Sequence, residues 1–232
     1  MSNKWFGLES NPEVMASYCG KMGLNTQKAS FYDVMSVEDW ALAMIPVPVY
    51  GVVFLFPINE SVEEFRRVEG EKIKAEGQIV SPNVYYMRQT VANACGTVGI
   101  LHAIGNAREN LEFTPGSYLE RFYQKSVPMS PMEIAQFLES DDEIGTIHGT
   151  AAQDGQSAPT NTDLDTHFIC FSCIDGVLYE LDGRKEFPIN HGSSSPDTLL
   201  YDACRVVKQF MERDPDEVRF TILALAAVSD DM

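Results

Sequence analysis

Apolar and polar residues follow two different periods along this chain, one typical of strands and the other of helices. Residues 46–57 are almost continuously apolar, which predicts a strand buried on both faces near the centre of a sheet. Residues 60–76 are densely charged but carry apolar side chains at helical spacing, which predicts an exposed amphipathic helix. Weaker patterns predict helices at residues 11–22, 37–44, 116–125, 130–140 and 195–210, and strands at residues 31–35, 84–88 and 220–228.

The dipeptide Asp175-Gly176 separates two runs that are rich in β-forming residues, and it favours the tight type I′ turn of an antiparallel hairpin. If the turn has two residues, Ile169 lies opposite Asp182, and His167 is the diagonal neighbour of Asp182 on the same sheet face. An imidazole and a carboxylate can form a hydrogen bond across this diagonal. The other histidines have no carboxylate placed opposite them by such a pairing. Because the hairpin is antiparallel, the sheet of the predicted α/β domain is at best mixed.

Cys95 lies where the predicted strand at residues 84–88 gives way to a buried helix. The first turn of a helix has unpaired N–H groups and the positive end of the helix dipole, and both stabilise a thiolate. Asn93 is expected to cap this turn. Considered alone, Cys95 is more simply explained as a small buried hydrophobic residue, which is the usual state of an intracellular cysteine.

The predicted pairing of His167 with Asp182 favours a reactive Cys95 instead. A nucleophile, a base that takes its proton and a carboxylate that orients the base form a recurrent catalytic set. Gln89 precedes Cys95 on the same segment, and its amide can donate a hydrogen bond to a developing oxyanion, beside the backbone N–H of Cys95. The candidate catalytic residues are therefore Gln89, Cys95, His167 and Asp182.

Two strings of residues, 89–104 and 167–192, closely resemble the ubiquitin carboxyl-terminal hydrolases, in particular their short, single-domain cytosolic isozymes. The similarity extends to residues 8–14 and 210–217, and so covers essentially the whole chain. The resemblance implies the same catalytic roles for the four candidates. It also implies one catalytic domain over residues 1–232 with the papain-like cysteine protease fold, of the α+β type. In that fold, helices lie on both sides of a mostly antiparallel or mixed central sheet, and the backbone is knotted.

The resemblance implies hydrolysis of the peptide, ester or thioester bond after the C-terminal glycine of ubiquitin. This deubiquitinating activity would release small adducts or short extensions and recycle free ubiquitin. For binding ubiquitin the resemblance suggests five further residues, namely Leu8, Glu9, Glu13, Asp33 and Glu217. Two alternatives are a catalytically weak protein that holds ubiquitin and a hydrolase that acts on a ubiquitin-like modifier.

Residues 149–165 show no periodicity and contain no aromatic residue and almost no large aliphatic residue, which predicts a mobile loop. The loop leads directly into His167, so we expect it to pass over or beside the cleft. In the resembled family this segment is the crossover loop, under which the substrate tail passes. The loop there limits the size of the leaving group.

The formal net charge of −17 argues against nucleic acid and anionic membranes as partners, because both are polyanions. It suits a basic partner such as the arginine-bearing tail of ubiquitin, although an acidic surface also serves solubility alone. The N-terminus has no apolar signal core, and no apolar run approaches a membrane-spanning length. We therefore expect a soluble, cytoplasmic monomer.

The five cysteines are an odd number, which in a cytosolic protein indicates free thiols rather than a disulfide framework. Cys170 and Cys173 have C-x-x-C spacing, but positions three apart in a strand face opposite sides of the sheet. Zinc binding and thioredoxin-like chemistry are therefore not expected, and neither is any other metal or cofactor. A thiol redox protein built on this pair is a further alternative, and it predicts activity that survives loss of Cys95.

Overall fold

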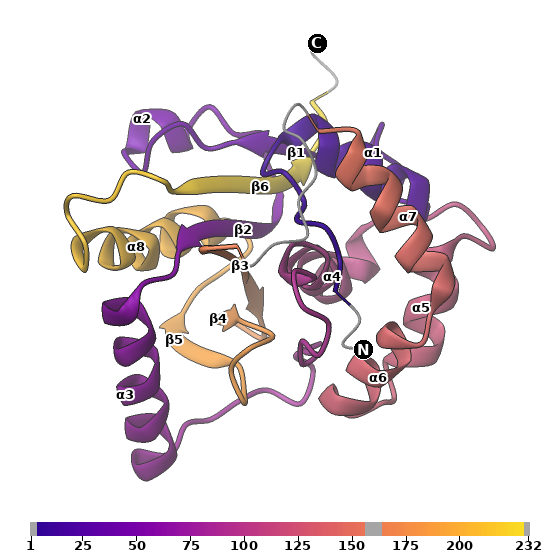
Figure 1. The fold of residues 1–232 in the computed structure, drawn as a ribbon. Coiled ribbons are helices and arrows are strands. Elements are labelled where there is room, and N and C mark those ends of the chain that lie inside the picture. The colour runs from indigo at the N-terminus through magenta and orange to yellow at the C-terminus, as the bar shows by residue number, and fades with distance from the viewer. Residues whose placement is uncertain (1–3, 156–163, 230–232) are drawn as a thin grey trace.

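The computed structural model describes residues 4–155 and 164–229, and Figure 1 shows the fold. The helices are α1 (Pro12–Met22), α2 (Asp39–Leu42), α3 (Glu60–Glu76), α4 (Cys95–Ala107), the 3₁₀ helix η1 (Arg108–Asn110), α5 (Tyr118–Ser126), α6 (Pro131–Glu139), α7 (Asp142–Gln153) and α8 (Leu199–Glu212). The strands are β1 (Ala29–Asp33), β2 (Val49–Pro57), β3 (Thr166–Ile174), β4 (Val177–Leu181), β5 (Ile189–Ser193) and β6 (Thr221–Ala227). Most of these elements lie within a few residues of where the sequence pattern predicts them.

The strands form one sheet in the order β1-β6-β2-β3-β4-β5, and every neighbouring pair is antiparallel. The continuously apolar strand β2 is an inner strand, as predicted. The strand expected at residues 84–88 does not form. That segment is bound to helix α4 instead: Tyr85 N donates to Asn106 Oδ1 over 2.8 Å. Likewise Met87 N donates to His102 Nε2 over 3.0 Å, so side chains of α4 take the place of a neighbouring strand.

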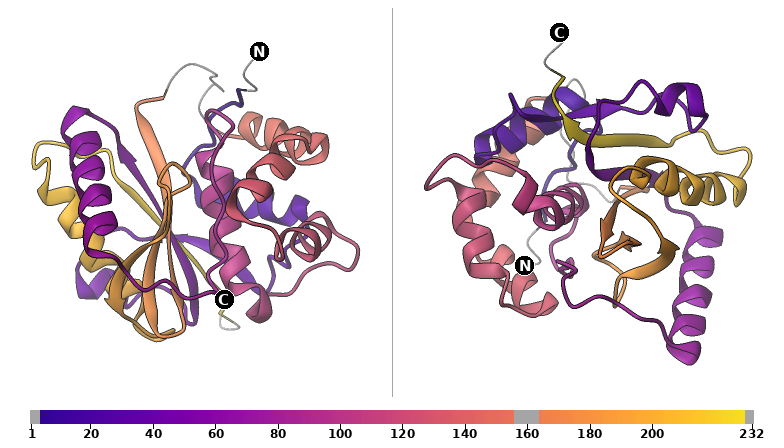
Figure 2. Two further views of the ribbon diagram at one scale, coloured as in Figure 1. Left: turned by 90° about the horizontal axis from the view of Figure 1, so that it is seen from below. Right: turned by 180° about the vertical axis from the view of Figure 1, so that it is seen from behind.

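Helices cover both faces of the sheet, as the left view of Figure 2 shows. One face packs with α1, α4, α5, α6 and α7 in a hydrophobic core that includes Met15 and Ile100. The other face packs with α2 and α8 in a second core that includes Phe54 and Val207. This three-layer arrangement confirms the predicted α/β class with helices on both sides of a central sheet.

Helix α4 runs through the first core, between the sheet and the outer helices (Figure 1). Of its 13 residues, 12 are buried, so it has apolar neighbours on all sides rather than along one stripe. The helix packs against β2 and β3. This packing places the first residue of α4, Cys95, beside the beginning of β3, where Phe168 lies against Gly96.

Helix α3 forms over the predicted residues 60–76, but its buried face differs from the expected apolar stripe. Val62 is buried, whereas Phe65 and Val68 are 38% and 49% exposed. Arg66 is buried instead. The helix stands beside β5 in Figure 1. Its buried Arg66 pairs with Asp182, which directly follows β4, so a charged side chain faces the sheet.

The loop predicted at residues 149–165 is shorter in the structure, because α7 continues to Gln153. Ala151 and Ala152 are buried in the first core, and alanine is the strongest helix former, although it adds little to an apolar pattern. Residues 156–163 of the expected loop lie outside the described residues. Within the described part of the chain, no helix combines the length and the apolar character needed to cross a membrane.

Candidate active site

The hairpin predicted from Asp175-Gly176 joins β3 and β4 in the predicted register, with Ile174 opposite Val177. Both turn residues have positive φ, 51° and 77°, as a type I′ turn requires. Asp182 directly follows β4, and its Oδ1 lies 2.7 Å from Nε2 of His167. The diagonal contact that the strand register predicts is therefore confirmed.

Cys95 begins helix α4, as the sequence predicts, but Asn93 does not cap the helix. Asn93 has a φ of 63°, and its Nδ2 donates to the carbonyl oxygen of Trp5 over 3.0 Å. No side chain caps the first turn of α4. The sulfur of Cys95 instead takes hydrogen bonds from backbone groups of Gly96 and Phe168, so the free N–H groups of the turn support a thiolate.

Cys95 and His167 are hydrogen-bonded through their side chains, and both are buried. Burial raises the pKa of Cys95, but the hydrogen bond and charge of His167 lower it more, and the net pKa lies below its ordinary value. Burial lowers the pKa of His167, but the charge of Asp182 and hydrogen bonds to Asp182 and Cys95 raise it to about 9. The lowered pKa of Cys95 and the raised pKa of His167 both favour the form of the pair in which the thiol has given its proton to the imidazole.

Asp182 is fully buried and ionised. Burial raises its pKa, but the charges of His167 and Arg66 hold the pKa well below its usual range. A carboxylate can only accept hydrogen bonds, so the Nε2–H of His167 must donate to it. This fixes the ring of His167 with its other nitrogen available to Cys95.

Gln89 is fixed through its backbone, whose N–H donates to the carbonyl oxygen of Gly183 over 2.8 Å. A side chain on Gly183 would come within 2.9 Å of the Cβ of Gln89, so only glycine allows this close approach beside Asp182. The side-chain Nε2 donates one hydrogen bond, to the carbonyl oxygen of Val91 over 3.1 Å. An amide nitrogen has a second N–H, which Gln89 can offer to an oxyanion.

The sequence analysis missed Arg66, whose Nη2 forms an ion pair with Oδ2 of Asp182. It also missed the backbone N–H of Arg184, which donates to Oδ1 of Asp182 over 2.9 Å. Helical spacing places Arg66 four residues after the buried Val62, on the same side of α3, whereas Arg67 is exposed and pairs with glutamates of its own helix. The spacing does not show that Asp182 is the partner of Arg66, because that pair depends on how distant segments pack.

Three of the residues suggested for ubiquitin binding lie along the N-terminal segment and the start of α1. Leu8 is buried against Gly96, next to Cys95. The carboxylate of Glu9 lies beside Gly155, which follows α7. Glu13 is exposed in the first turn of α1. The structure thus brings Leu8 close to the catalytic candidates and leaves Glu13 facing solvent.

The other two, Asp33 and Glu217, lie at the same end of the sheet as His167, because of the register of β1, β6, β2 and β3. Asp33 is exposed at the end of β1. The carboxylate of Glu217 is 2.9 Å from Arg219, which lies 2.5 Å from Asp165. Since Asp165 precedes β3, charged groups continue from Glu217 toward the strand that carries His167. A role of these residues in binding ubiquitin stays a prediction.

The remaining histidines have structural partners, and one of them corrects the sequence analysis. His102 is buried in α4 and accepts a hydrogen bond from Met87 N, as a core residue should. The predicted hairpin places no carboxylate opposite His191, but His191 lies in β5, and its Nε2 is 2.9 Å from Oε2 of the buried Glu180. The sequence gives no sign of this pair, because β5 lacks an apolar pattern.

His148 belongs to a chain of buried hydrogen bonds that ties the N-terminal segment to α4. Its Nε2 donates to the carbonyl oxygen of Phe6 over 2.7 Å, and its Nδ1 lies 2.9 Å from Oγ1 of Thr97. Tyr18 OH lies 2.9 Å from the same Thr97 oxygen. Burial lowers the pKa of His148 to about 4, which keeps its ring neutral in this chain.

The cysteines of the described residues are all free, as the odd number predicts. Cys170 lies in the first core and Cys173 against the second, so they face opposite sides of the sheet as expected. Burial raises the pKa of the thiols of Cys19, Cys170 and Cys204. In the described ranges, no three histidine, cysteine or acidic side chains lie close enough to hold a metal ion.

Comparison with known proteins gives a consistent result. A family model described as ubiquitin carboxyl-terminal hydrolase, family 1, matches residues 5–212. Ubiquitin carboxyl-terminal hydrolase 3 of Arabidopsis thaliana is 46% identical over 225 residues, which are 97% of this chain and 95% of that protein. Ubiquitin carboxyl-terminal hydrolase isozyme L1 of Homo sapiens is 42% identical over 218 residues, which are 94% of this chain and 96% of that protein.

Among solved structures, the catalytic domain of UCH37 from Trichinella spiralis, bound to ubiquitin vinyl methyl ester, has a similar fold. Its TM-score is 0.75 at 19% sequence identity, and the match covers 98% of this chain and 97% of that one. The fold and the resemblance found in the sequence therefore agree. Because the family model and these relatives span nearly all of its length, this chain belongs to family 1 of the ubiquitin carboxyl-terminal hydrolases, which are thiol-dependent cysteine peptidases.

Proposed function

We propose that this protein hydrolyses the bond after the C-terminal glycine of ubiquitin, with Cys95 as nucleophile. The observation that carries the proposal is the buried, hydrogen-bonded series of Cys95, His167 and Asp182, in which the thiol has a lowered pKa. Related proteins named ubiquitin carboxyl-terminal hydrolases align over nearly the whole chain and support the choice of substrate.

The chemistry follows from the positions of the four residues. The thiolate of Cys95 attacks the carbonyl carbon, and the amide of Gln89 together with the N–H of Cys95 stabilises the oxyanion. The imidazolium of His167 gives its proton to the leaving amine, and a thioester on Cys95 remains. His167 then takes a proton from the water that attacks the thioester, the carbon–sulfur bond breaks, and ubiquitin leaves behind the thiolate and imidazolium with which the reaction began. Asp182 holds the ring of His167 throughout.

Ubiquitin is proposed to rest on the two groups of residues described above. Asp33 and Glu217 carry negative charge at the end of the sheet that holds His167, and such charge attracts a basic tail. Leu8 lies beside the first turn of α4, where the end of the tail must reach Cys95, and Glu9 lies beside Gly155, which follows α7. Glu13 extends this surface along α1. The charge of −17 supports a basic partner over nucleic acid or an anionic membrane.

The leaving group is proposed to be a small adduct or a short extension, as the resemblance to the family implies. We also propose that the protein acts as a monomer in the cytoplasm, a compartment that agrees with the free thiols of the described residues.

A ubiquitin-like modifier is the second candidate substrate, because the acidic surface recognises charge rather than one sequence.

The test of this function is the turnover of ubiquitin that carries a fluorogenic C-terminal amide. We expect steady hydrolysis by the unmodified protein and a loss of roughly a hundredfold or more in kcat for Gln89→Ala, because one oxyanion donor is removed. The matched control is Gln124→Ala, which removes an exposed amide from α5 and should retain full activity. Tight ubiquitin binding without hydrolysis by the unmodified protein would instead support a protein that only holds ubiquitin.

In the same assay, the pKa of His167 predicts how activity depends on pH. The pKa of His167 is raised to about 9, so its ring keeps the proton needed by the leaving group below that pH and loses it above. We expect kcat/KM to fall on the alkaline side with a midpoint near pH 9. A fall near pH 7, close to the pKa of a free imidazole, would show that Asp182 does not raise the pKa of His167 in solution.

A further inference from the structure

Arg66 has an unusual environment for a charged side chain. Among the described residues it is the only arginine or lysine that is buried. It extends from α3 toward the sheet, where its Nη2 pairs with Oδ2 of Asp182 and its Nη1 donates to Oε1 of Glu63 over 3.0 Å. Removing a guanidinium from water is costly, and such burial is found where the charge has a fixed partner.

The partner of Arg66 is the carboxylate that orients the catalytic histidine. Oδ1 of Asp182 takes the hydrogen bonds from Nε2 of His167 and from the backbone N–H of Arg184. Oδ2 takes the ion pair from Arg66. The torsion that rotates a carboxylate is broad, so hydrogen bonds to one oxygen alone leave the group more room to turn than contacts to both oxygens. Binding at both oxygens is what holds Oδ1 in line with His167.

We propose that Arg66 is a positioning residue for catalysis, which acts through Asp182 to hold His167 against Cys95. This inference rests on the proposed function and adds a fifth residue to it. The contacts of Arg66 are with Asp182 and Glu63, so its effect on the reacting atoms is indirect. Its contribution is to keep the carboxylate in one orientation during the two proton transfers of His167.

A merely structural role, in which Arg66 anchors α3, explains less of what is observed. The helix has other anchors: Val62 lies in the second core, and the guanidinium of Arg213 lies 3.5 Å from the centre of the Phe65 ring. The ammonium of Lys185 is 2.7 Å from Glu69 of the same helix. None of these three contacts involves Arg66. The pair with Asp182 is therefore not needed to hold α3 in place.

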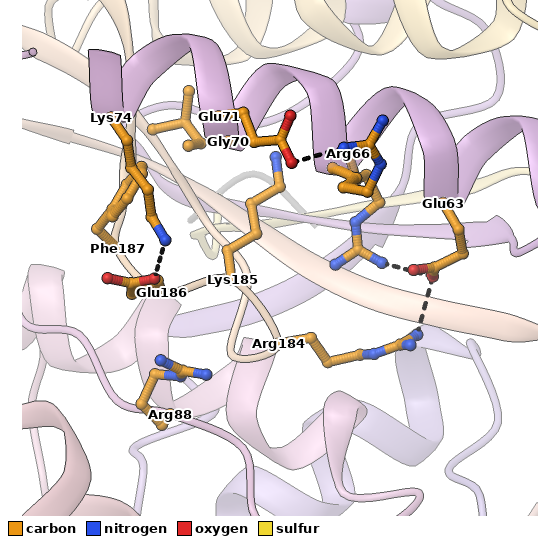
Figure 3. Close-up of a pocket in the computed structure, with 12 residues that line it drawn as sticks. Glu63, Arg66, Gly70, Glu71, Lys74, Arg88, Arg184, Lys185, Glu186 and Phe187 are labelled. Atoms are coloured by element: carbon orange, nitrogen blue, oxygen red, sulfur yellow. Dashed lines mark hydrogen bonds and ion pairs between the residues drawn. The ribbon is translucent and has the colours of Figure 1, made fainter.

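The space beside Arg66 makes the proposal testable by chemical rescue. A cavity of about 410 Å³ lies between α3 and the segment that follows Asp182. Figure 3 shows Arg66, Arg88, Arg184 and Lys185 around it. A side chain shortened at residue 66 would leave a path from this cavity to Oδ2 of Asp182, wide enough for a small guanidinium ion.

The first measurement compares Arg66→Ala with its matched control, Arg67→Ala. The control removes the same guanidinium group one residue along α3, where Arg67 pairs with Glu64 and Glu71. We expect Arg66→Ala to lower kcat by about tenfold or more with KM for the ubiquitin amide unchanged, which is the scale found for residues that orient catalytic groups. Arg67→Ala should retain the kcat of the unmodified protein.

The second measurement adds methylguanidinium at a concentration below that which unfolds the protein. It should restore much of the kcat of Arg66→Ala, while sodium chloride at equal ionic strength should not. If Arg66→Ala fails to fold, Arg66→Lys replaces it, and its single ammonium should restore only part of the activity. Unchanged kcat in a folded Arg66 variant, or a loss that the guanidinium ion does not repair, would overturn the proposal.

The third measurement needs no substrate, and it separates this inference from the proposed function. The proton between Nε2 of His167 and Oδ1 of Asp182 should give a downfield proton resonance in the unmodified protein and in Arg67→Ala. We expect this resonance to weaken or move upfield in Arg66→Ala and to return with methylguanidinium. An unmoved resonance would overturn the positioning role, whereas a moved resonance in a protein without hydrolytic activity would contradict only the proposed function.

Discussion

Cys95→Ala is expected to abolish hydrolysis of the fluorogenic ubiquitin amide, with a fall in kcat of at least about ten-thousandfold. The reason is that no other thiol can take over the reaction. Burial raises the pKa of Cys19, Cys170 and Cys204, so these thiols stay protonated near neutral pH. Alanine leaves the rest of the site in place, and ubiquitin should still bind.

The matched control for this prediction is Cys173→Ala, which also removes one thiol, but from the far face of β3. It should keep full activity. Ubiquitin with an electrophilic C-terminus should form a covalent adduct with the unmodified protein and with Cys173→Ala, visible as an added mass, and none with Cys95→Ala. Activity that survives in Cys95→Ala and disappears in Cys173→Ala would favour the redox alternative built on Cys170 and Cys173.

Asp182→Asn is expected to lower kcat on the order of a thousandfold to ten-thousandfold, although the side chain keeps its shape. An amide cannot hold His167 as a cation, and its NH₂ group can stabilise the wrong tautomer of the ring. The control is Asp175→Asn at the hairpin turn, where the carboxylate is exposed and the backbone conformation suits asparagine. Activity of Asp182→Asn within about tenfold of the unmodified protein would contradict the assigned role.

The same substitution should also lower stability, because it leaves Arg66 buried without its charged partner. We expect the free energy of unfolding at pH 7 to fall by about 3 to 5 kcal/mol, measured by urea denaturation. The folded-state pKa of Asp182 is lowered, so its contribution is complete above the unfolded pKa of about 4 and declines as the pH falls below it. The difference in unfolding free energy between Asp182→Asn and the unmodified protein should therefore narrow in acid. An equal difference in unfolding free energy at pH 7 and in acid would contradict this origin.

Local sequence patterns predict the catalytic hairpin because its information is local. A turn dipeptide at Asp175-Gly176 sets the register, and counting along two strands then pairs His167 with Asp182. Cys95 at the start of α4 follows from a change of period, which is also local. These three positions needed no knowledge of how distant parts of the chain pack.

The features that the sequence does not predict depend on packing between distant segments. Residues 84–88 have the pattern of a strand, but side chains of α4 bind their N–H groups, and no neighbouring strand is present. Asn93 has the chemistry of a helix cap, yet it binds Trp5, which lies 88 residues earlier. Arg66 and Asp182 are 116 residues apart, and the helical spacing of α3 does not show which carboxylate Arg66 meets. Such contacts become visible only once the sheet has brought the segments together.

The burial of α4 on all sides has a consequence for how the protein folds. A helix without a polar face has little stability by itself in water, and a single helix of this length is only marginally stable even with favourable residues. Its partners β2 and β3 come from segments far apart along the chain, so the helix must wait for contacts that form late. The position of Cys95 at the start of α4 is therefore fixed only when β2 and β3 have come together around the helix.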